Sequence, residues 1–200
     1  IMSKGIFENT KYFIIDMDGT FYLDGNIIEG STDFINKALE TGRDFYFFTN
    51  NSSNNVEVCR AKLEKMGFPV AEDKVIISSH VAADYLNRNY AGKKVFLLGN
   101  ERLTGDFEKA GINLVDKDPD IVVLGFDTTL SYDRLNRFCQ FVRDGVDYIG
   151  VNPDWNCPLE GGKFMPDCGS IAKLIEASTG RFPQFFGKPS PYTLQFIKDI

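Results

Sequence analysis

The chain has 200 residues, 43% of them hydrophobic and 14% aromatic, so it can bury a sizeable core. Its net charge of −6 and pI near 4.9 argue against a surface for nucleic acid or anionic membranes. A single histidine, His80, excludes a histidine-rich zinc site. There is no run of about 18 apolar residues and no C-x-x-C spacing among the four cysteines, so we expect a cytoplasmic protein with reduced thiols.

The first predicted element is a strand over residues 12–15, four bulky apolar residues without a break. Such a run is typical of a strand buried on both faces of a parallel sheet. Asp16 and Asp18 follow it, and Gly19 allows a sharp turn. Open α/β sheets bind ligands at the carboxyl ends of their strands, so the two aspartates are candidate site residues. On this stretch alone, an ordinary Asp-Gly turn explains the residues as well.

Strand and helix patterns alternate along the rest of the chain, which makes a parallel sheet with right-handed crossovers the economical fold. After a hairpin or loop at 23–26, Ser31 is the expected cap of a helix. His80 follows two serines at a predicted helix start, where we expect a capping or packing role. The pattern predicts helices near 31–42, 54–66, 101–110, 131–144, 170–177 and 192–200, and strands at 45–48, 75–77, 95–98, 121–124, 148–151 and 185–186.

A long segment, residues 152–162, is too rich in Pro, Gly and Asn to predict regular structure, and we expect a turn at 160–162. Long loops in compact domains are usually functional. We expect Trp155 to be exposed there and to screen a leaving group, with packing against a sheet as the alternative.

Polar groups also follow two further predicted strands. Thr49 and Asn50 follow the strand at 45–48, and Lys188 follows the strand at 185–186. In one parallel sheet these groups would lie along the same edge as the aspartates. A carboxylate can attack phosphorus, a second can protonate the leaving oxygen, and the other groups can neutralise phosphate oxygens. Two carboxylates beside a phosphate dianion require a divalent cation, and oxygen ligands point to Mg²⁺.

The three motifs D-M-D-G-T, T-N-N-S and G-K-P-S-P, in this order, resemble those of the haloacid dehalogenase superfamily of phosphatases. The resemblance runs from about Tyr12 to Pro191. The insertion before the third motif resembles the α/β cap of the 4-nitrophenylphosphatase and nucleotide-monophosphatase branch, class IIA. The resemblance implies an α/β fold with a Rossmann-like parallel core, residues 1–79 and 181–200, and an inserted cap domain, residues 80–180.

The resemblance also implies an activity, the Mg²⁺-dependent hydrolysis of a small phosphorylated metabolite through an aspartyl phosphate. In that mechanism Asp16 is the nucleophile and a metal ligand. Asp18 is the general acid and base and lends its backbone carbonyl to the metal. Neither a nucleic acid nor a membrane is an implied partner, and association of copies through the cap is compatible with the resemblance. The substrate-binding residues that it implies are Met17, Thr49, Asn50 and Lys188.

Two other functions remain open at this stage. A receiver-type signalling domain also carries phosphate on an aspartate, but receivers are about half this length and lack the insertion. A catalytically silent phosphate binder is the other, which the intact pair Asp16 and Asp18 disfavours.

A fourth family motif, G-D-x-x-x-T-D, has no match between Lys188 and Ile200. The segments 99–101 and 125–127 precede Lys188 and are poor substitutes. We therefore expect the natural protein to continue for roughly 50 residues or more. In the printed chain, the strand at 12–15 is then expected to border an exposed apolar edge.

Overall fold

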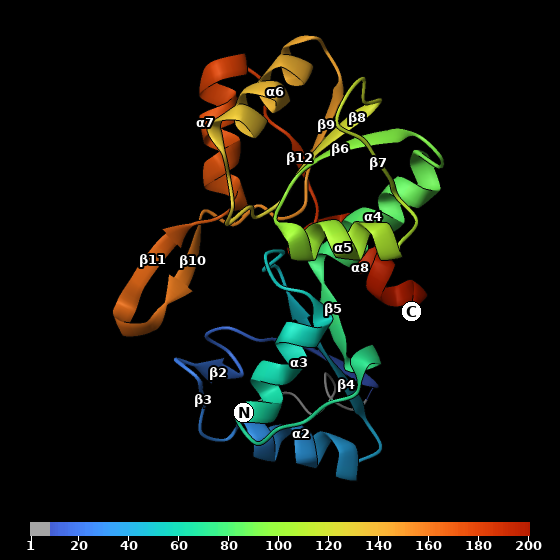
Figure 1. The fold of residues 1–200 in the computed structure, drawn as a ribbon. Coiled ribbons are helices and arrows are strands. Elements are labelled where there is room, and N and C mark those ends of the chain that lie inside the picture. Colours follow the sequence, from blue (N-terminus) through green and yellow to red (C-terminus); the bar gives the residue numbers. More distant parts are fainter. Residues whose placement is uncertain (1–8) are drawn as a thin grey trace. The chain divides into compact units, whose positions relative to one another are not determined.

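A computed structural model describes residues 9–200, except for the side chain of residue 160 (Figure 1). The chain divides into two compact units. The first ends at Thr49 and resumes over Val56–Ile76, and the second contains Asn50–Asn55 and Ile77–Ile200. Residues 181–200 thus lie in the second unit. The domain scheme of a core at 1–79 and 181–200 with a cap at 80–180 stays a prediction.

The first unit is built on a three-stranded sheet in the order β1–β4–β5, made of β1 (Tyr12–Asp16), β4 (Asp44–Thr49) and β5 (Val75–Ile77). β1 and β4 are parallel, with Asp16 opposite Phe48. All three strands were predicted. The predicted burial of β1 on both faces is wrong, because β1 is an edge strand among the described residues, with Tyr12 58% and Ile14 39% exposed. The expected exposed apolar edge is confirmed.

Among the described residues, the first unit also has two helices and a hairpin: α2 (Ser31–Glu40), α3 (Val56–Lys65), β2 (Tyr22–Leu23) and β3 (Asn26–Ile27), with a 3₁₀ turn, η1 (Glu72–Lys74). The predicted capping role of Ser31 is wrong. Gly30 occupies the N-cap with a φ of 84°, and no side chain caps the helix. A residue with positive φ there turns the chain without a side-chain cap, which leaves Ser31 as the first helical residue.

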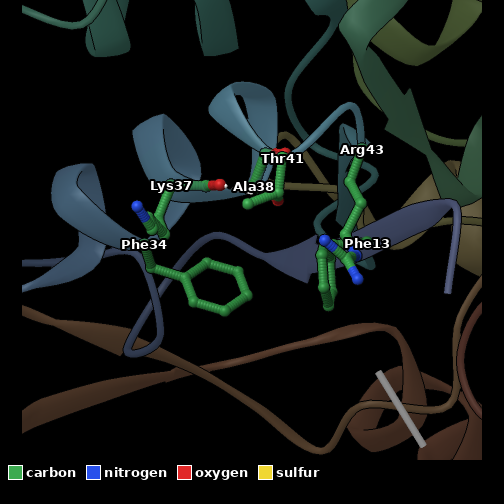
Figure 2. A pocket seen from close by; sticks show the side chains of 6 residues that line it. All are labelled: Phe13, Phe34, Lys37, Ala38, Thr41 and Arg43. Atoms are coloured by element: carbon green, nitrogen blue, oxygen red, sulfur yellow. Dashed lines mark hydrogen bonds between the residues drawn. The ribbon is translucent and has the colours of Figure 1, made fainter. Parts of the chain in front are cut away.

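A cavity of about 200 Å³ lies between β1 and α2 (Figure 2). The rings of Phe13 from β1 and Phe34 from α2 approach edge to face there, 5.0 Å between centroids. Lys37 and Arg43 are also among its lining residues. The cavity contains neither Asp16 nor Asp18, so it is not the site that the sequence predicts.

An aromatic cluster anchors the turn after β1. Phe21, 1% exposed, packs 4.7 Å from Phe47 and 4.9 Å from Phe68, measured between ring centroids. Aromatic pairs of this kind contribute about 0.5–1.5 kcal/mol beyond their buried area. The turn that carries Asp18 is therefore fixed at its far end to β4.

The second unit contains a five-stranded parallel sheet in the order β12–β9–β8–β6–β7. Every side chain of β8 is fully buried, which explains its unbroken apolar sequence. The predicted strand before Lys188 exists as β12, but it pairs with β9, so it does not share a sheet with β1 as expected. The strands are β6 (Lys94–Leu98), β7 (Asn113–Leu114), β8 (Ile121–Leu124), β9 (Asp147–Gly150) and β12 (Gln184–Phe185).

Helices lie on both sides of this sheet: α6 and α7 on one side, α4 and α5 on the other (Figure 1). Asn100, Ser131 and Asp167 cap α5, α6 and α7. His80 accepts a long hydrogen bond, 3.5 Å, from the N–H of Ile77, so its expected capping role is confirmed. Among residues 9–200, no helix has the length and apolar character that a membrane crossing requires. The helices are α4 (Ser78–Asn89), α5 (Glu101–Lys109), α6 (Tyr132–Arg143), α7 (Cys168–Thr179) and α8 (Pro191–Asp199).

The segment 152–162 is not the irregular loop that we expected. It enters an antiparallel hairpin, β10 (Asn156–Leu159) and β11 (Lys163–Pro166), which projects from its unit (Figure 1). The predicted turn at 160–162 joins the two strands. Proline is tolerated in edge strands, and a two-stranded ribbon has only edges. Trp155 precedes β10 and is 52% exposed, as expected, while its screening role stays a prediction.

A buried polar network ties the segment 50–55 to the start of α7. Ser52 donates to Asn152 at 2.9 Å, and Asn152 donates to Asp167 Oδ1 at 3.0 Å. The N–H of Cys168 donates to the same oxygen at 2.5 Å. Burial raises the pKa of Asp167 from 3.8 to about 6, although these hydrogen bonds oppose the rise and Asp154 adds to it.

The raised pKa makes the stability of the protein depend on pH. Between about pH 4 and 6 the folded state binds the Asp167 proton more tightly than the unfolded state does. The contribution of the Asp167 proton to the free energy of unfolding is complete below pH 4 and is lost as the pH rises through 6. Asp167→Asn keeps an oxygen acceptor without the charge. Above pH 6 its free energy of unfolding should therefore be about 1–3 kcal/mol higher than that of the wild type. Urea unfolding from pH 4 to 7 measures this, and parallel curves for both proteins would contradict it.

Candidate active site

The turn after β1 is fixed by its own backbone. The carbonyl of Met17 accepts the N–H groups of residues 20, 21 and 22 at 3.3, 3.0 and 3.2 Å. Gly19 takes a φ of 80°, a conformation that glycine adopts without strain. Thr20 then donates its hydroxyl to Asp16 Oδ2 at 3.0 Å. The sequence D-M-D-G-T therefore folds into a closed turn in which the threonine orients the first aspartate.

The second aspartate has a different partner. Lys62 of α3 donates to Asp18 Oδ1 at 3.0 Å, and its ammonium also lies 4.0 Å from the centroid of the Tyr22 ring. Burial, followed by the neighbouring Asp18 carboxylate, raises the pKa of Tyr22 well above its usual value. The phenol therefore stays protonated. Sequence reasoning missed Lys62, because a lysine on an exposed helix face gives no signal.

Met17 was expected to contact the substrate, but its side chain is fully buried in the structure. A contact through that side chain would require a change of conformation. A second cavity, of about 390 Å³, lies beside the turn. Its lining includes Ile15, which precedes Asp16, and Thr20, two residues after Asp18.

Asn50 and Lys188 lie together in the second unit. The Asn50 amide donates to the carbonyl of Lys188 at 2.9 Å and to Asp154 Oδ1 at 3.1 Å. Its Oδ1 accepts the N–H of Lys188 at 2.8 Å. Both N–H groups of the amide thus have protein acceptors, and the expected contact of Asn50 with phosphate stays a prediction. The side chain clamps the main chain at Lys188.

Gly187 allows this clamp to close. Its φ is +73°, and a Cβ there would lie 2.5 Å from Asn50 Oδ1. The Gly187 carbonyl is held by Ser190 and Thr193 at the start of α8, at 2.8 and 2.7 Å. The motif G-K-P-S-P therefore fixes the backbone of Lys188 from both sides.

The segment that begins with Asn50 is also held along its length. Ser78 donates to the carbonyl of Asn50 at 2.9 Å, and Asn100 donates to the carbonyl of Ser53 at 2.9 Å. Thr49 ends β4 in the first unit and is 4% exposed. The division between the units falls between Thr49 and Asn50.

The donor set at the turn fits Mg²⁺. The Asp16 carboxylate and the Asp18 carbonyl supply only oxygen, and Mg²⁺ is usually bound by one or two carboxylates, substrate phosphate and water. Among residues 9–200 there is no cluster of three or more His, Cys, Asp or Glu that could hold a metal ion. The two poor substitutes for the fourth motif have structural roles. Asn100 caps α5, and Asp127, buried, pairs with Arg134 at 2.9 Å.

Three comparisons with known proteins show which family the chain belongs to. A family model described as haloacid dehalogenase-like hydrolase matches residues 13–113. An acid sugar phosphatase of Staphylococcus haemolyticus is 33% identical over 194 residues, which cover 96% of this chain and 73% of that protein. The chain belongs to the haloacid dehalogenase-like hydrolases. A Staphylococcus aureus acid sugar phosphatase is 35% identical over 90% of this chain and 70% of its own length.

Solved structures place the fold in the same family. The 4-nitrophenylphosphatase of Thermotoga maritima has a TM-score of 0.90 and 43% identity, over 95% of this chain and 73% of that one. NagD of E. coli K-12 has a TM-score of 0.85 and 29% identity, over 95% and 74%. These neighbours confirm the α/β fold class and the class IIA branch. The chain is therefore an enzyme, a phosphatase of the haloacid dehalogenase type.

The clamp on Lys188 can be tested with a pair of glycine variants. Gly187→Ala places a methyl group against Asn50 and should displace Lys188, so kcat for phosphate-ester hydrolysis should fall about tenfold or more. Gly180→Ala is the matched control, because its φ is +74° and a Cβ there meets nothing within 4 Å. Both variants should lose about 1 kcal/mol of stability from backbone strain, measured by urea unfolding. Equal kinetics for the two would mean that the clamp does not position Lys188.

Proposed function

We propose that this chain hydrolyses small phosphate monoesters through a phosphorylated Asp16, with Mg²⁺ as the metal. The observation that carries the proposal is the turn after β1. It places two carboxylates two residues apart and gives them different partners, a hydroxyl for Asp16 and an ammonium for Asp18. One fixed nucleophile beside one separately held acid and base is what two-step phosphoryl transfer requires.

In the first step an oxygen of Asp16 bonds to phosphorus as the bond to the leaving oxygen breaks. Asp18 gives its proton to that oxygen, so an alcohol departs. In the second step Asp18 takes a proton from water, whose oxygen displaces Asp16 and releases inorganic phosphate. The hydrogen bond from Thr20 to Oδ2 fixes the rotamer of Asp16 for the attack.

Phosphate binding is assigned to Thr49, Asn50 and Lys188. The hydroxyl of Thr49 and the ammonium of Lys188 would neutralise phosphate oxygens. For Asn50 we assign the backbone N–H, because its side-chain amide is engaged with Lys188 and Asp154. Mg²⁺, held by Asp16 and the Asp18 carbonyl, would neutralise charge on the transferring phosphoryl group.

The substrate class is proposed from the relatives. Those named acid sugar phosphatase and 4-nitrophenylphosphatase suggest alkyl phosphates such as sugar phosphates, with aryl phosphates as model substrates. A receiver-like phosphoacceptor is the second candidate, since Asp16 alone would suffice for it. A cytoplasmic location and association of copies through the cap also stay proposals.

The proposal is tested by phosphate release from a panel of sugar phosphates, nucleoside monophosphates, phosphoglycolate, pyridoxal phosphate and 4-nitrophenyl phosphate, with Mg²⁺ or with EDTA. We expect steady turnover that EDTA abolishes. Asp16→Asn should reduce it to background, because the variant lacks the attacking carboxylate. Asp33→Asn changes an exposed carboxylate on α2 and should have the turnover rate of the wild type. One equivalent of bound phosphate without turnover would favour the phosphoacceptor.

Asp18→Asn should separate leaving groups. General acid–base catalysis contributes about 10²–10⁴ in rate, so kcat/KM for an alkyl phosphate should fall by that factor. The loss for 4-nitrophenyl phosphate should be smaller, because 4-nitrophenolate leaves without protonation. Steady-state kinetics with both substrates measure the difference. Full activity of the variant on an alkyl phosphate would rule out the acid and base role.

A further inference from the structure

The carboxylate of Asp18 is held by a side chain from another element of the first unit. Lys62 reaches it from α3, with Nζ 3.0 Å from Oδ1. The Lys62 ammonium also lies 4.0 Å from the centroid of the Tyr22 ring, which belongs to β2, so the tyrosine holds the lysine in turn.

Tyr22 is the rigid member of this group. It is 3% exposed. Its N–H donates a hydrogen bond to the Met17 carbonyl at 3.2 Å, and its carbonyl accepts one from the Gly19 N–H at 2.8 Å. Its phenol is therefore fixed relative to the turn that carries both aspartates. Lys62 is more exposed, at 43% of its side chain, and exposed ion pairs add little to folding stability. Its position on the acid and base makes a kinetic role the better explanation.

We propose that Lys62 is a positioning residue that holds the Asp18 carboxyl group in place for proton transfer, with the Tyr22 ring holding Lys62 in turn. The inference rests on the proposed function, since it concerns the same reaction. Neither residue gives up or takes the proton. Asp18 alone exchanges it, first with the leaving oxygen and then with water.

The role follows from what proton transfer requires. A general acid must stand within hydrogen-bond reach of the leaving oxygen, which in turn is set by the line of attack from Asp16. A carboxyl group free to rotate spends part of its time pointing elsewhere. Loss of its holders should therefore lower the rate of the protonation step and leave phosphate binding intact.

The test compares Lys62→Met with Lys65→Met. Lys65 is an exposed lysine at the end of the same helix. Lys62→Met should lower kcat/KM for an alkyl phosphate about tenfold and for 4-nitrophenyl phosphate less than about twofold. The kcat/KM value reports only steps up to departure of the alcohol, so a slow second step does not mask the difference. Lys62→Arg should restore most of the activity, and Tyr22→Leu, which removes the ring beside the Lys62 ammonium, should show the same selective loss. Lys65→Met should match the wild type on both substrates.

The same changes in an Asp18→Asn background decide whether the two residues act through Asp18. There Lys62→Met should have no further effect on either substrate, and a full tenfold loss would overturn the inference. Equal losses on both substrates in the wild-type background, with a lowered melting temperature, would also overturn it, since they indicate a structural role. The inference would also be overturned if the wild type were active and Lys62→Met had the same kinetics as Lys65→Met. A wild type that hydrolyses neither substrate would refute the proposed function itself, and this inference with it.

Discussion

The parallel pairing of β1 with β4 is the constraint on which the chemistry of the first unit depends. Its register puts Asp16 opposite Phe48, so Asp16 and Thr49 end neighbouring strands at the same edge. A shift of one residue would reverse the faces of β1 and move Asp16 away from that edge. The aromatic contacts of Phe21 with Phe47 oppose such a shift, because they tie the following turn to β4. The register and the turn after β1 are therefore stabilised by the same contacts.

In the second unit the comparable constraint is the Asn50 amide. A polar side chain in a binding motif can contact the ligand or can hold the backbone that presents other ligating groups. Here the amide makes two hydrogen bonds with the main chain of Lys188 and one with Asp154. Such a clamp costs conformational freedom once, on folding, so the backbone at Lys188 does not have to be ordered when a phosphate binds. Gly187 belongs to the same arrangement, since a side chain there would collide with the amide.

The sequence was sufficient for the parts of the structure that depend on local pattern. The apolar runs of β1, β4 and β8 and most helices were predicted, and the motif order indicated the family that the comparisons confirm. The parts that failed depend on partners distant in sequence. No local signal shows that β12 pairs with β9. The hairpin β10–β11 was missed because its prolines argue against strands, and that argument holds only for central ones.

The site divides in the same way. The residue types of Asp16, Asp18 and Lys188 could be identified from the motifs, since chemistry restricts which side chains can serve. Their supporting contacts could not, because Lys62 is 44 residues from Asp18 and looks like any solvated lysine. Yet these contacts make two chemically identical carboxylates different. Thr20 donates a neutral hydroxyl to Asp16, which orients that carboxylate. Asp18 instead pairs with the Lys62 ammonium, which also lies over the Tyr22 ring, so its orientation is fixed by side chains of other elements. The two proposed roles therefore follow from the elements around the turn, β2 and α3, rather than from the aspartates themselves.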